Sequence, residues 1–193
     1  ALFLAERLVN SGHSCIVLEC NTDEPRLWML TGTQGQEWQE NVAALVANAN
    51  KQPNGLAVIA PSIALPMRFR NERWYGALLE ACLQTYDRVV LSAAPVLNEH
   101  LTSPPPGMLA QIAETSILIT RARVDTQAQL VRARDLLQPA GDKLCGIVIN
   151  DSDNPALAEL LIQEVDERLQ QRPVLAARLR EWLRQTAILN IEY

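Results

Sequence analysis

The sequence predicts an α/β fold in which a mostly parallel sheet is covered by helices on both faces, with two extra helices at the C-terminal end. Short uninterrupted apolar runs recur over the first 150 residues, and helical periodicity fills the intervals between them. Beyond residue 150 only the helical periodicity continues. Strands that are apolar without alternation are typical of a parallel sheet buried on both faces, and the intervening helices supply its crossovers.

The elements follow one another in a simple order. A helix is expected over residues 2–10, where apolar side chains share one side and Gly12 provides a C-cap. Strands are expected at 14–19, 56–60, 88–92, 116–120 and 144–150. Further helices are expected at 37–49, 71–85, 105–114, 126–138, 155–170 and 173–186. We therefore expect one α/β domain over residues 1–151 and a helical extension over 152–193 that packs on the same domain.

Composition excludes several classes of function. A net charge of −5 argues against a nucleic-acid groove, which needs a concentrated basic surface. The four cysteines show no CxxC spacing and lie in apolar runs, so we expect small buried side chains rather than a zinc site or a disulfide framework. Because no apolar run reaches the roughly 18–20 residues that span a bilayer, we expect a cytoplasmic domain without a membrane span.

Several strands end in polar side chains, and the first of these segments carries a recognisable motif. Residues 16–28 read Ile-Val-Leu-Glu-Cys-Asn-Thr-Asp-Glu-Pro-Arg-Leu-Trp. The segment resembles the second phosphate-site motif of bacterial tyrosine kinases of polysaccharide export, members of the ParA/MinD-like P-loop superfamily. In that family the strand ends Asp-x-Asp, a basic loop and Pro-Arg-Leu follow, and the acidic pair works around the magnesium ion of bound ATP. Glu19 and Asn21 take the two aspartate positions, whereas residues 25–27 match outright.

Three later segments resemble the same family in the same order, so that the resemblance covers roughly residues 1–151. Residues 86–97 resemble the Walker B strand, with Ser92 at the position of its acid. Residues 116–126 resemble the strand and Arg-Ala-x-x-Thr turn that follow it. Residues 145–150 resemble the strand whose final Asn lies by the adenine, which is Asn150 in this sequence.

The phosphate-binding loop itself is not found in the sequence. The motif GxxxxGK[ST] needs a lysine after a glycine, but Lys51 follows Asn50 and Lys143 follows Asp142. In the resemblance, the helix at 2–10 corresponds to the helix that follows this loop. We therefore expect the Walker A region to lie upstream of Ala1 or to be absent.

The substitutions predict a degenerate site without catalysis. A site of this kind neutralises phosphate charge with lysine and with Mg²⁺ held by carboxylates or hydroxyls. Ser92 supplies no carboxylate and Asn21 has lost its charge, although Glu19 keeps one. We expect no bound metal or cofactor, and Mg·ATP only if the natural protein has an upstream P-loop.

Two further residues are possible nucleotide contacts in this resemblance. Arg26 either holds a phosphate or a neighbouring subunit, or is a solvated loop residue. Asn150 either contacts a base or, with the polar residues after it, caps the next helix. The family ends in a run of tyrosines that neighbouring subunits phosphorylate, but this chain has only Tyr193 there, and an incidental tyrosine is the favoured interpretation.

Three hypotheses about function remain open. The first is a non-catalytic, protein-binding or regulatory domain of exopolysaccharide or capsule export, whose partner is a membrane-anchored polysaccharide co-polymerase or a second copy of the chain. The second is an active ATPase or tyrosine autokinase whose P-loop precedes Ala1. The third is an atypical ParA/MinD-like protein that positions pili or other surface machinery. The apolar stripe around Trp182 is expected either on the domain's own sheet or at a partner.

Overall fold

The computed structural model describes residues 1–32, 37, 39–60, 66–98, 102–151, 157–169 and 173–186. The chain divides into two compact units. The first contains residues 1–117 and 131–146, and the second contains residues 118–130 and 147–193. This division does not coincide with a boundary at residue 151, and the packing of residues 152–193 on the preceding domain stays a prediction.

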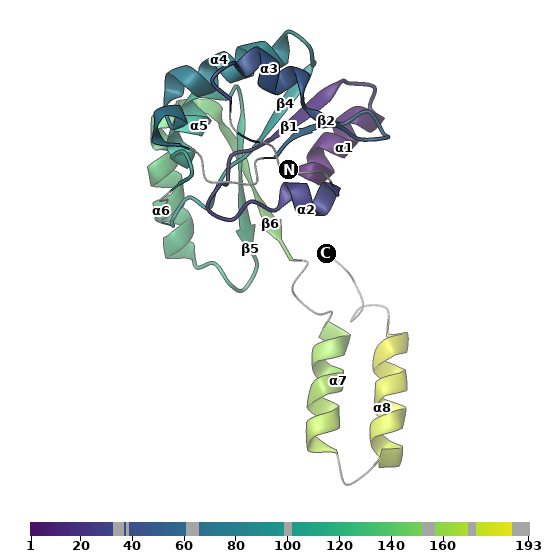
Figure 1. The fold of residues 1–193 in the computed structure, drawn as a ribbon. Helices are drawn as coiled ribbons and strands as arrows, with labels where there is room; N and C mark the ends of the chain where they lie inside the picture. Colours follow the sequence, from purple (N-terminus) through teal and green to yellow (C-terminus); the bar gives the residue numbers. More distant parts are fainter. Residues whose placement is uncertain are drawn as a thin grey trace. The chain divides into compact units, whose positions relative to one another are not determined.

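The first unit is built on a four-stranded sheet with the order β2-β3-β1-β4 (Figure 1). Its strands are β1 (Cys15–Glu19), β2 (Asn50–Lys51), β3 (Ala57–Ile59) and β4 (Arg88–Ser92). Strand β1 pairs in parallel with both β3 and β4, which confirms the three strands predicted over this part of the chain. The short β2 pairs antiparallel with β3 and was not predicted, because two residues leave no pattern in the sequence.

Helices cover this sheet on both faces, as the apolar runs predict. Successive side chains of β1 point to opposite faces, so that Ile16 and Leu18 enter one core while Cys15 and Val17 enter the other. The first core is completed by α3 (Val42–Ala47), α4 (Glu72–Leu83) and α5 (Pro106–Ile112). The second is completed by α1 (Leu2–Asn10) through the fully buried Ala5. All five residues of β1 are buried, which makes it the central strand of the unit.

Local signals in the sequence explain where these helices begin and end. The side chain of Asn41 accepts hydrogen bonds from the N–H groups of Ala43 and Ala44, and so caps α3. Asn71 caps α4 in the same way through the N–H of Trp74. Beyond α1 the chain turns at Gly12, whose φ of +89° suits a residue without a Cβ.

The two later strands differ from expectation. Strands β5 (Ser116–Arg121) and β6 (Leu144–Asn150) form a separate two-stranded sheet, joined by α6 (Gln127–Leu137) and a 3₁₀ segment, η2 (Gln138–Lys143). The prediction that these strands are buried was wrong: the side chain of Ile119 is 60% exposed and that of Ile149 is 67% exposed. Each strand is paired along one edge only in the described sheet, and a sheet of two strands offers little cover for the side chains on its faces.

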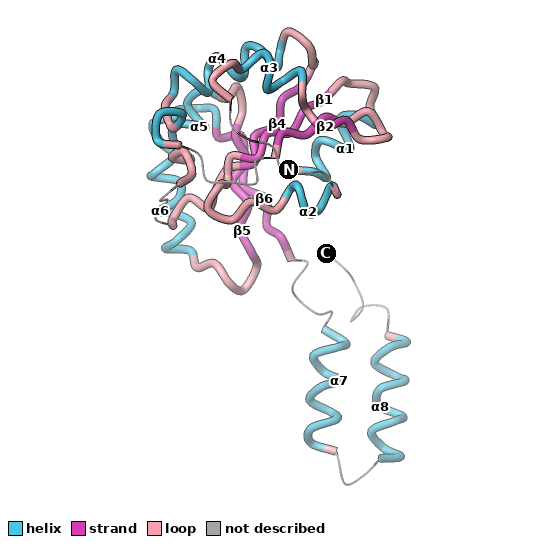
Figure 2. Tube along the Cα trace, viewed as in Figure 1, coloured by secondary structure: helices cyan, strands magenta, loops and turns pink. Residues whose placement is uncertain are grey.

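The last two helices form an antiparallel hairpin (Figure 2). Helices α7 (Leu157–Arg168) and α8 (Pro173–Gln185) begin and end within about two residues of the predicted bounds. Leu183 is buried between them, and an ion pair of 3.5 Å joins Arg180 on α8 to Asp166 on α7. Among the described helices, none is long and apolar enough to cross a bilayer.

Acid should weaken the first unit through one carboxylate at the start of β1 and β4. Asp87 accepts hydrogen bonds from the N–H and hydroxyl of Ser14, at 2.9 and 2.7 Å, and these bonds lower the pKa of Asp87. The carboxyl group of Asp87 therefore becomes protonated at a higher pH in the unfolded chain than in the folded one. As a result, the free energy of unfolding falls as pH drops below about 4. We expect Asp87→Asn to flatten this loss in urea unfolding measured between pH 7 and pH 3. Asp142→Asn, at an exposed carboxylate, is the control, and an unchanged acid slope in Asp87→Asn contradicts the assignment.

Candidate functional site at the ends of strands β1 and β4

Three of the residues that the sequence singled out lie together in the first unit. Glu19 and Ser92 are direct partners in the parallel register of β1 and β4. The N–H groups of Cys20 and Asn21 both donate to the carbonyl oxygen of Ser92, at 2.8 and 3.1 Å. The predicted proximity of Glu19, Asn21 and Ser92 is therefore confirmed, and it follows from strands that end at one edge of a sheet.

A pocket of about 360 Å³ opens beside these strand ends. Its apolar walls come from α1 and from α2 (Leu27–Thr31). Its polar groups come from the ends of β1 and β4 and from the loop between β1 and α2. The apolar residues are Ala1, Leu2, Phe3, Leu27 and Leu30, and the polar residues are Glu19, Asn21, Glu24, Arg26 and Ser92. The pocket thus contains four of the five candidate site residues.

The carboxylate of Glu19 is directed at the start of α2. Its Oε2 atom accepts hydrogen bonds from the backbone N–H groups of Arg26 and Leu27, at 2.9 and 2.5 Å, and the residue is only 4% exposed. Burial raises the pKa of Glu19, and the two N–H bonds act in the opposite direction. A helix of five residues needs such a partner for its first N–H groups. Glu19 therefore works in this structure as the acceptor that fixes α2.

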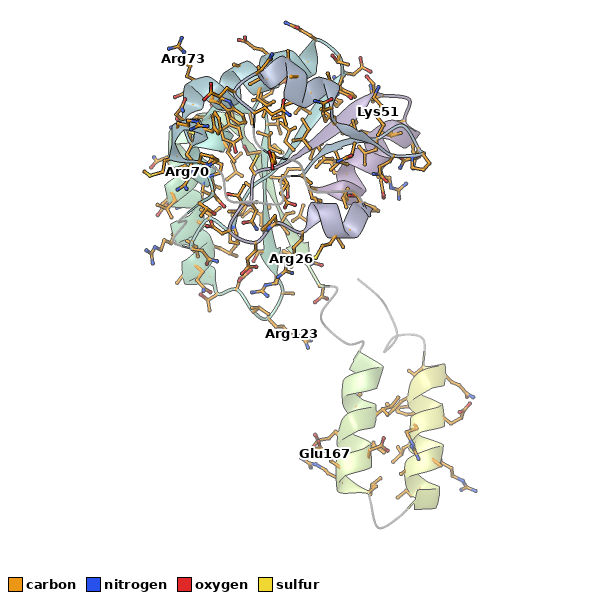
Figure 3. All side chains as sticks on the ribbon, viewed as in Figure 1. Arg26, Lys51, Arg70, Arg73, Arg123 and Glu167 are labelled. Atoms are coloured by element: carbon orange, nitrogen blue, oxygen red, sulfur yellow. The ribbon has the colours of Figure 1, made fainter. Side chains whose placement is uncertain are left out.

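The other polar side chains of the pocket bind their own loop. The Oδ1 atom of Asn21 accepts from the N–H of Glu24 at 3.3 Å, which closes a turn. The guanidinium of Arg26 lies 3.2 Å from the carboxylate of Glu24, and both side chains are 71% exposed (Figure 3). Such an exposed ion pair is worth little energetically, so Arg26 has the surroundings of a solvated loop residue.

A second set of contacts anchors the same loop and was missed from the sequence. The carboxylate of Asp23 accepts from the N–H and hydroxyl of Thr102, at 2.8 and 2.7 Å. In return, the hydroxyl of Ser103 accepts from the N–H groups of Thr22 and Asp23. A Thr-Ser pair before a run of prolines is a local signal of a turn, but nothing in it identifies a partner about 80 residues away. The loop is therefore held at both of its ends.

Buried cysteines lie beneath the loop, in the core of the first unit. Cys20 is fully buried beside Tyr75, and burial raises the pKa of Cys20 to about 12. Burial likewise raises the pKa of Cys82 to about 12, so neither thiol ionises near neutral pH. Cys145 differs from the prediction because it is exposed. Over the described part of the chain, no cluster of histidine, cysteine and acidic side chains has the arrangement of a metal site.

Asn150 belongs to the second unit, and the structure does not place it relative to the pocket. Its carbonyl oxygen accepts from the N–H of Ala122 at 2.9 Å, which joins the ends of β5 and β6. The turn after β5 is closed by Asp125, which accepts from the N–H of Arg121 and the hydroxyl of Thr120. Arg123 in this turn has a φ of +59°. The predicted gathering of Asn150 with Glu19 and Ser92 stays a prediction.

Replacing Glu19 should reveal its part in holding α2. Glu19→Ala leaves the buried N–H of Leu27 without its acceptor, and we expect a loss of about 1–3 kcal/mol in the free energy of unfolding. Glu19→Gln keeps a carbonyl oxygen, so its loss at neutral pH should be smaller. Denaturant unfolding measures both, with Glu6→Ala on the exposed side of α1 as the control. A Glu19→Ala chain as stable as the control would show that the contact is dispensable.

The same residue gives a pH dependence of opposite sign to that of Asp87. Because the pKa of Glu19 is raised in the folded chain, its carboxyl group stays protonated to a higher pH there than in the unfolded chain. The contribution of Glu19 to the free energy of unfolding therefore falls as pH rises above about 4.3. Glu19→Gln should remove this fall. The measurement is the pH slope of unfolding free energy between pH 4 and pH 7, and a slope shared by Glu19→Gln and the parent chain contradicts the expectation.

Comparison with known proteins identifies the fold. No family model and no curated protein matches the sequence. The structure is similar to the kinase domain of the Escherichia coli tyrosine kinase ETK, with a TM-score of 0.64 and 18% identity, covering 76% of this chain and 59% of that one. It is also similar to the VpsO kinase domain, with a TM-score of 0.61 and 19% identity, covering 77% of this chain and 75% of that one.

A third similar structure is not a kinase domain. The septum site-determining protein MinD of Pyrococcus horikoshii, solved with Mg-ADP, gives a TM-score of 0.56 at 13% identity. The match covers 79% of this chain and 63% of that one. At these identities the likeness concerns the fold, and the chain spans only part of each relative's length. The chain thus has the α/β fold shared by bacterial tyrosine kinase domains and MinD, as the strand-end motifs implied.

Proposed function

We propose that this domain is a non-catalytic relative of the bacterial tyrosine kinase domains and that it acts by binding proteins of exopolysaccharide or capsule export. The observation that carries the proposal is the position of the Glu19 carboxylate. It is the one acid kept at the two strand-end positions of the motif, and its Oε2 atom already accepts from the N–H groups of Arg26 and Leu27. A carboxylate that holds a helix is poorly available to a cation.

Neither Ser92 nor Asn21 replaces the Glu19 carboxylate as a ligand for a cation. Magnesium prefers oxygen ligands in near-octahedral geometry, and phosphoryl transfer needs this cation to neutralise the phosphates. Ser92 offers a hydroxyl and Asn21 an amide oxygen that already accepts from Glu24. The sequence also contains no GxxxxGK[ST] segment, whose N–H groups and lysine would attract a polyphosphate.

The walls of the pocket fit a protein partner better than a polyphosphate. Phe3 is 70% exposed and Leu30 71% exposed at its mouth, and Met29 on the same short helix is 57% exposed. Apolar side chains gathered around a concave site are typical of surfaces that receive a side chain of another protein. A membrane-anchored polysaccharide co-polymerase or a second copy of the chain is the partner we propose, at the cytoplasmic face of the membrane.

An active ATPase or tyrosine autokinase is the alternative, in which residues preceding Ala1 supply the phosphate-binding loop. Glu19 favours it, because this carboxylate lines the pocket where a metal would be needed. An atypical ParA/MinD-like protein of surface machinery is a third candidate, favoured by the structural likeness to MinD.

Calorimetric titration with Mg·ATP separates these candidates. We expect the chain to bind Mg·ATP weakly or not at all and to release no phosphate. The sequence contains no phosphate-binding loop, and the two carboxylates among the described residues that line the pocket, Glu19 and Glu24, already have partners. The same measurements belong on a version that includes the natural residues before Ala1, with Glu19→Gln as the matched variant. Micromolar, Mg²⁺-dependent binding with phosphate release that Glu19→Gln abolishes would show that the site is catalytic.

A further inference from the structure

The α7–α8 hairpin has two unlike faces. On one of them the Arg180–Asp166 ion pair bridges the helices. Among the described side chains of the hairpin, three large apolar ones remain accessible, and we call them the hairpin patch: Leu161, Leu175 and Trp182, which are 37%, 45% and 59% exposed. The interior contact between the helices is made without them, through residues such as Ala176 and Leu183, each 4% exposed.

Helix geometry places the hairpin patch on the face opposite the ion pair. Leu175 and Trp182 are seven residues apart, so they lie in one stripe along α8. Arg180 is two residues from Trp182, which corresponds to about 200° around the helix. Leu161 is likewise separated from Asp166 on α7 by about 140°. The patch is therefore the side of the hairpin that the ion pair leaves open.

An exposed tryptophan flanked by leucines is costly to leave in water. Burial of apolar surface contributes roughly 25 cal/mol per Å², and tryptophan has the largest side chain to bury. Tryptophan is also enriched among the residues that dominate binding energy at protein interfaces. Trp182 keeps 59% of its surface accessible.

The charges of the two helices indicate what covers the patch. On α7 the exposed acids are Glu164, Asp166 and Glu167, against one exposed arginine, Arg168. Helix α8 has the opposite charge, because it carries arginines at 178 and 180 and one acid, at 181. A hairpin with one acidic and one basic helix complements itself when two copies meet with unlike helices facing each other.

Unmatched charges remain on each helix for such a contact. The Arg180–Asp166 and Arg168–Glu164 pairs are formed within the hairpin. Over the described residues, no ion pair is formed by Glu167 on α7 or by Arg178 on α8, and Figure 3 shows Glu167 on the side of α7 away from α8. Arg178 lies between Leu175 and Trp182 along α8, at the edge of the hairpin patch.

We propose that a second copy of this chain covers the hairpin patch. Two hairpins pack face to face about a twofold axis, with α7 of each copy against α8 of the other. Trp182 and Leu161 of both copies form the apolar centre, and the acids Glu164 and Glu167 of one copy meet Arg178 of the other at the rim. The inference uses no residue of the pocket, so it can fail while the proposed absence of catalysis holds.

The expected dimer is small and concentration-dependent. Helices of 12 and 13 residues are about 18–20 Å long, so the buried area lies at the low end for specific interfaces. Sedimentation velocity and light scattering on the full chain should show a dimer at tens of micromolar that dissociates on dilution. Trp182→Ala should weaken it at least about tenfold. Leu83→Ala on α4, at a leucine 58% exposed, is the matched control and should leave the dimer unchanged.

A charge exchange tests the pairing of unlike helices directly. Glu164→Lys with Glu167→Lys makes both helices basic, and Arg178→Glu makes α8 more acidic. Each variant alone should be monomeric, because like charges then meet at the rim. An equal mixture should form a heterodimer, because position 178 of one copy and positions 164 and 167 of the other then carry opposite charges. Circular dichroism checks that helix content is retained.

Three results would overturn the proposal. A parent chain that stays monomeric at every concentration shows that the patch is covered by its own chain or by a different protein. A dimer that Trp182→Ala leaves intact is formed by another surface. A mixture of the two charge variants that stays monomeric excludes the pairing of α7 with α8 of the other copy.

Discussion

The bond between the Glu19 carboxylate and the first N–H groups of α2 is the constraint on which the pocket depends. Strand β1 is buried throughout and brings Glu19 to the sheet edge, where one oxygen reaches Arg26 and Leu27. Because α2 has only five residues, its position follows from this acceptor and from the burial of Leu27. The apolar wall that α2 gives to the pocket is thus fixed by a charged group beneath it.

The loop between β1 and α2 combines this contact with a second one at its other side. Asp23 binds Thr102, and Ser103 binds back to the loop. Of the polar residues in and before this loop, Glu19, Asn21 and Asp23 each accept from backbone N–H groups. In a site built for a nucleotide, such groups are kept for phosphate oxygens and a metal ion. The strand ends lie together as the motif implies, and the side chains of Glu19 and Asn21 accept from backbone N–H groups nearby.

Much of the first unit was predictable, because its signals are local. The apolar runs at 14–19 and 88–92 became β1 and β4, and their register brought Glu19 against Ser92 as the motif implied. The sequence did not reveal that Glu19 caps α2 or that Asp23 binds Thr102. Several acceptors could satisfy these N–H groups, and only the tertiary structure determines which of them lies close enough. The positions of strands β5 and β6 in the sequence were predicted correctly, but their burial was not. An apolar run indicates a strand whose side chains favour burial, but it does not identify the element that packs on them.

The exposed side chains of strand β6 affect how prone the chain is to aggregation. Its seven residues, Leu144–Asn150, contain neither charge nor proline, and Ile147, Val148 and Ile149 are all about half exposed or more. A short, uncharged, β-branched segment is the type that stacks into cross-β aggregates and attracts chaperones. Lys143 stands immediately before it and acts as a charged gatekeeper at one end only. Whatever packs on β6 therefore also shields a segment that could otherwise stack with other chains.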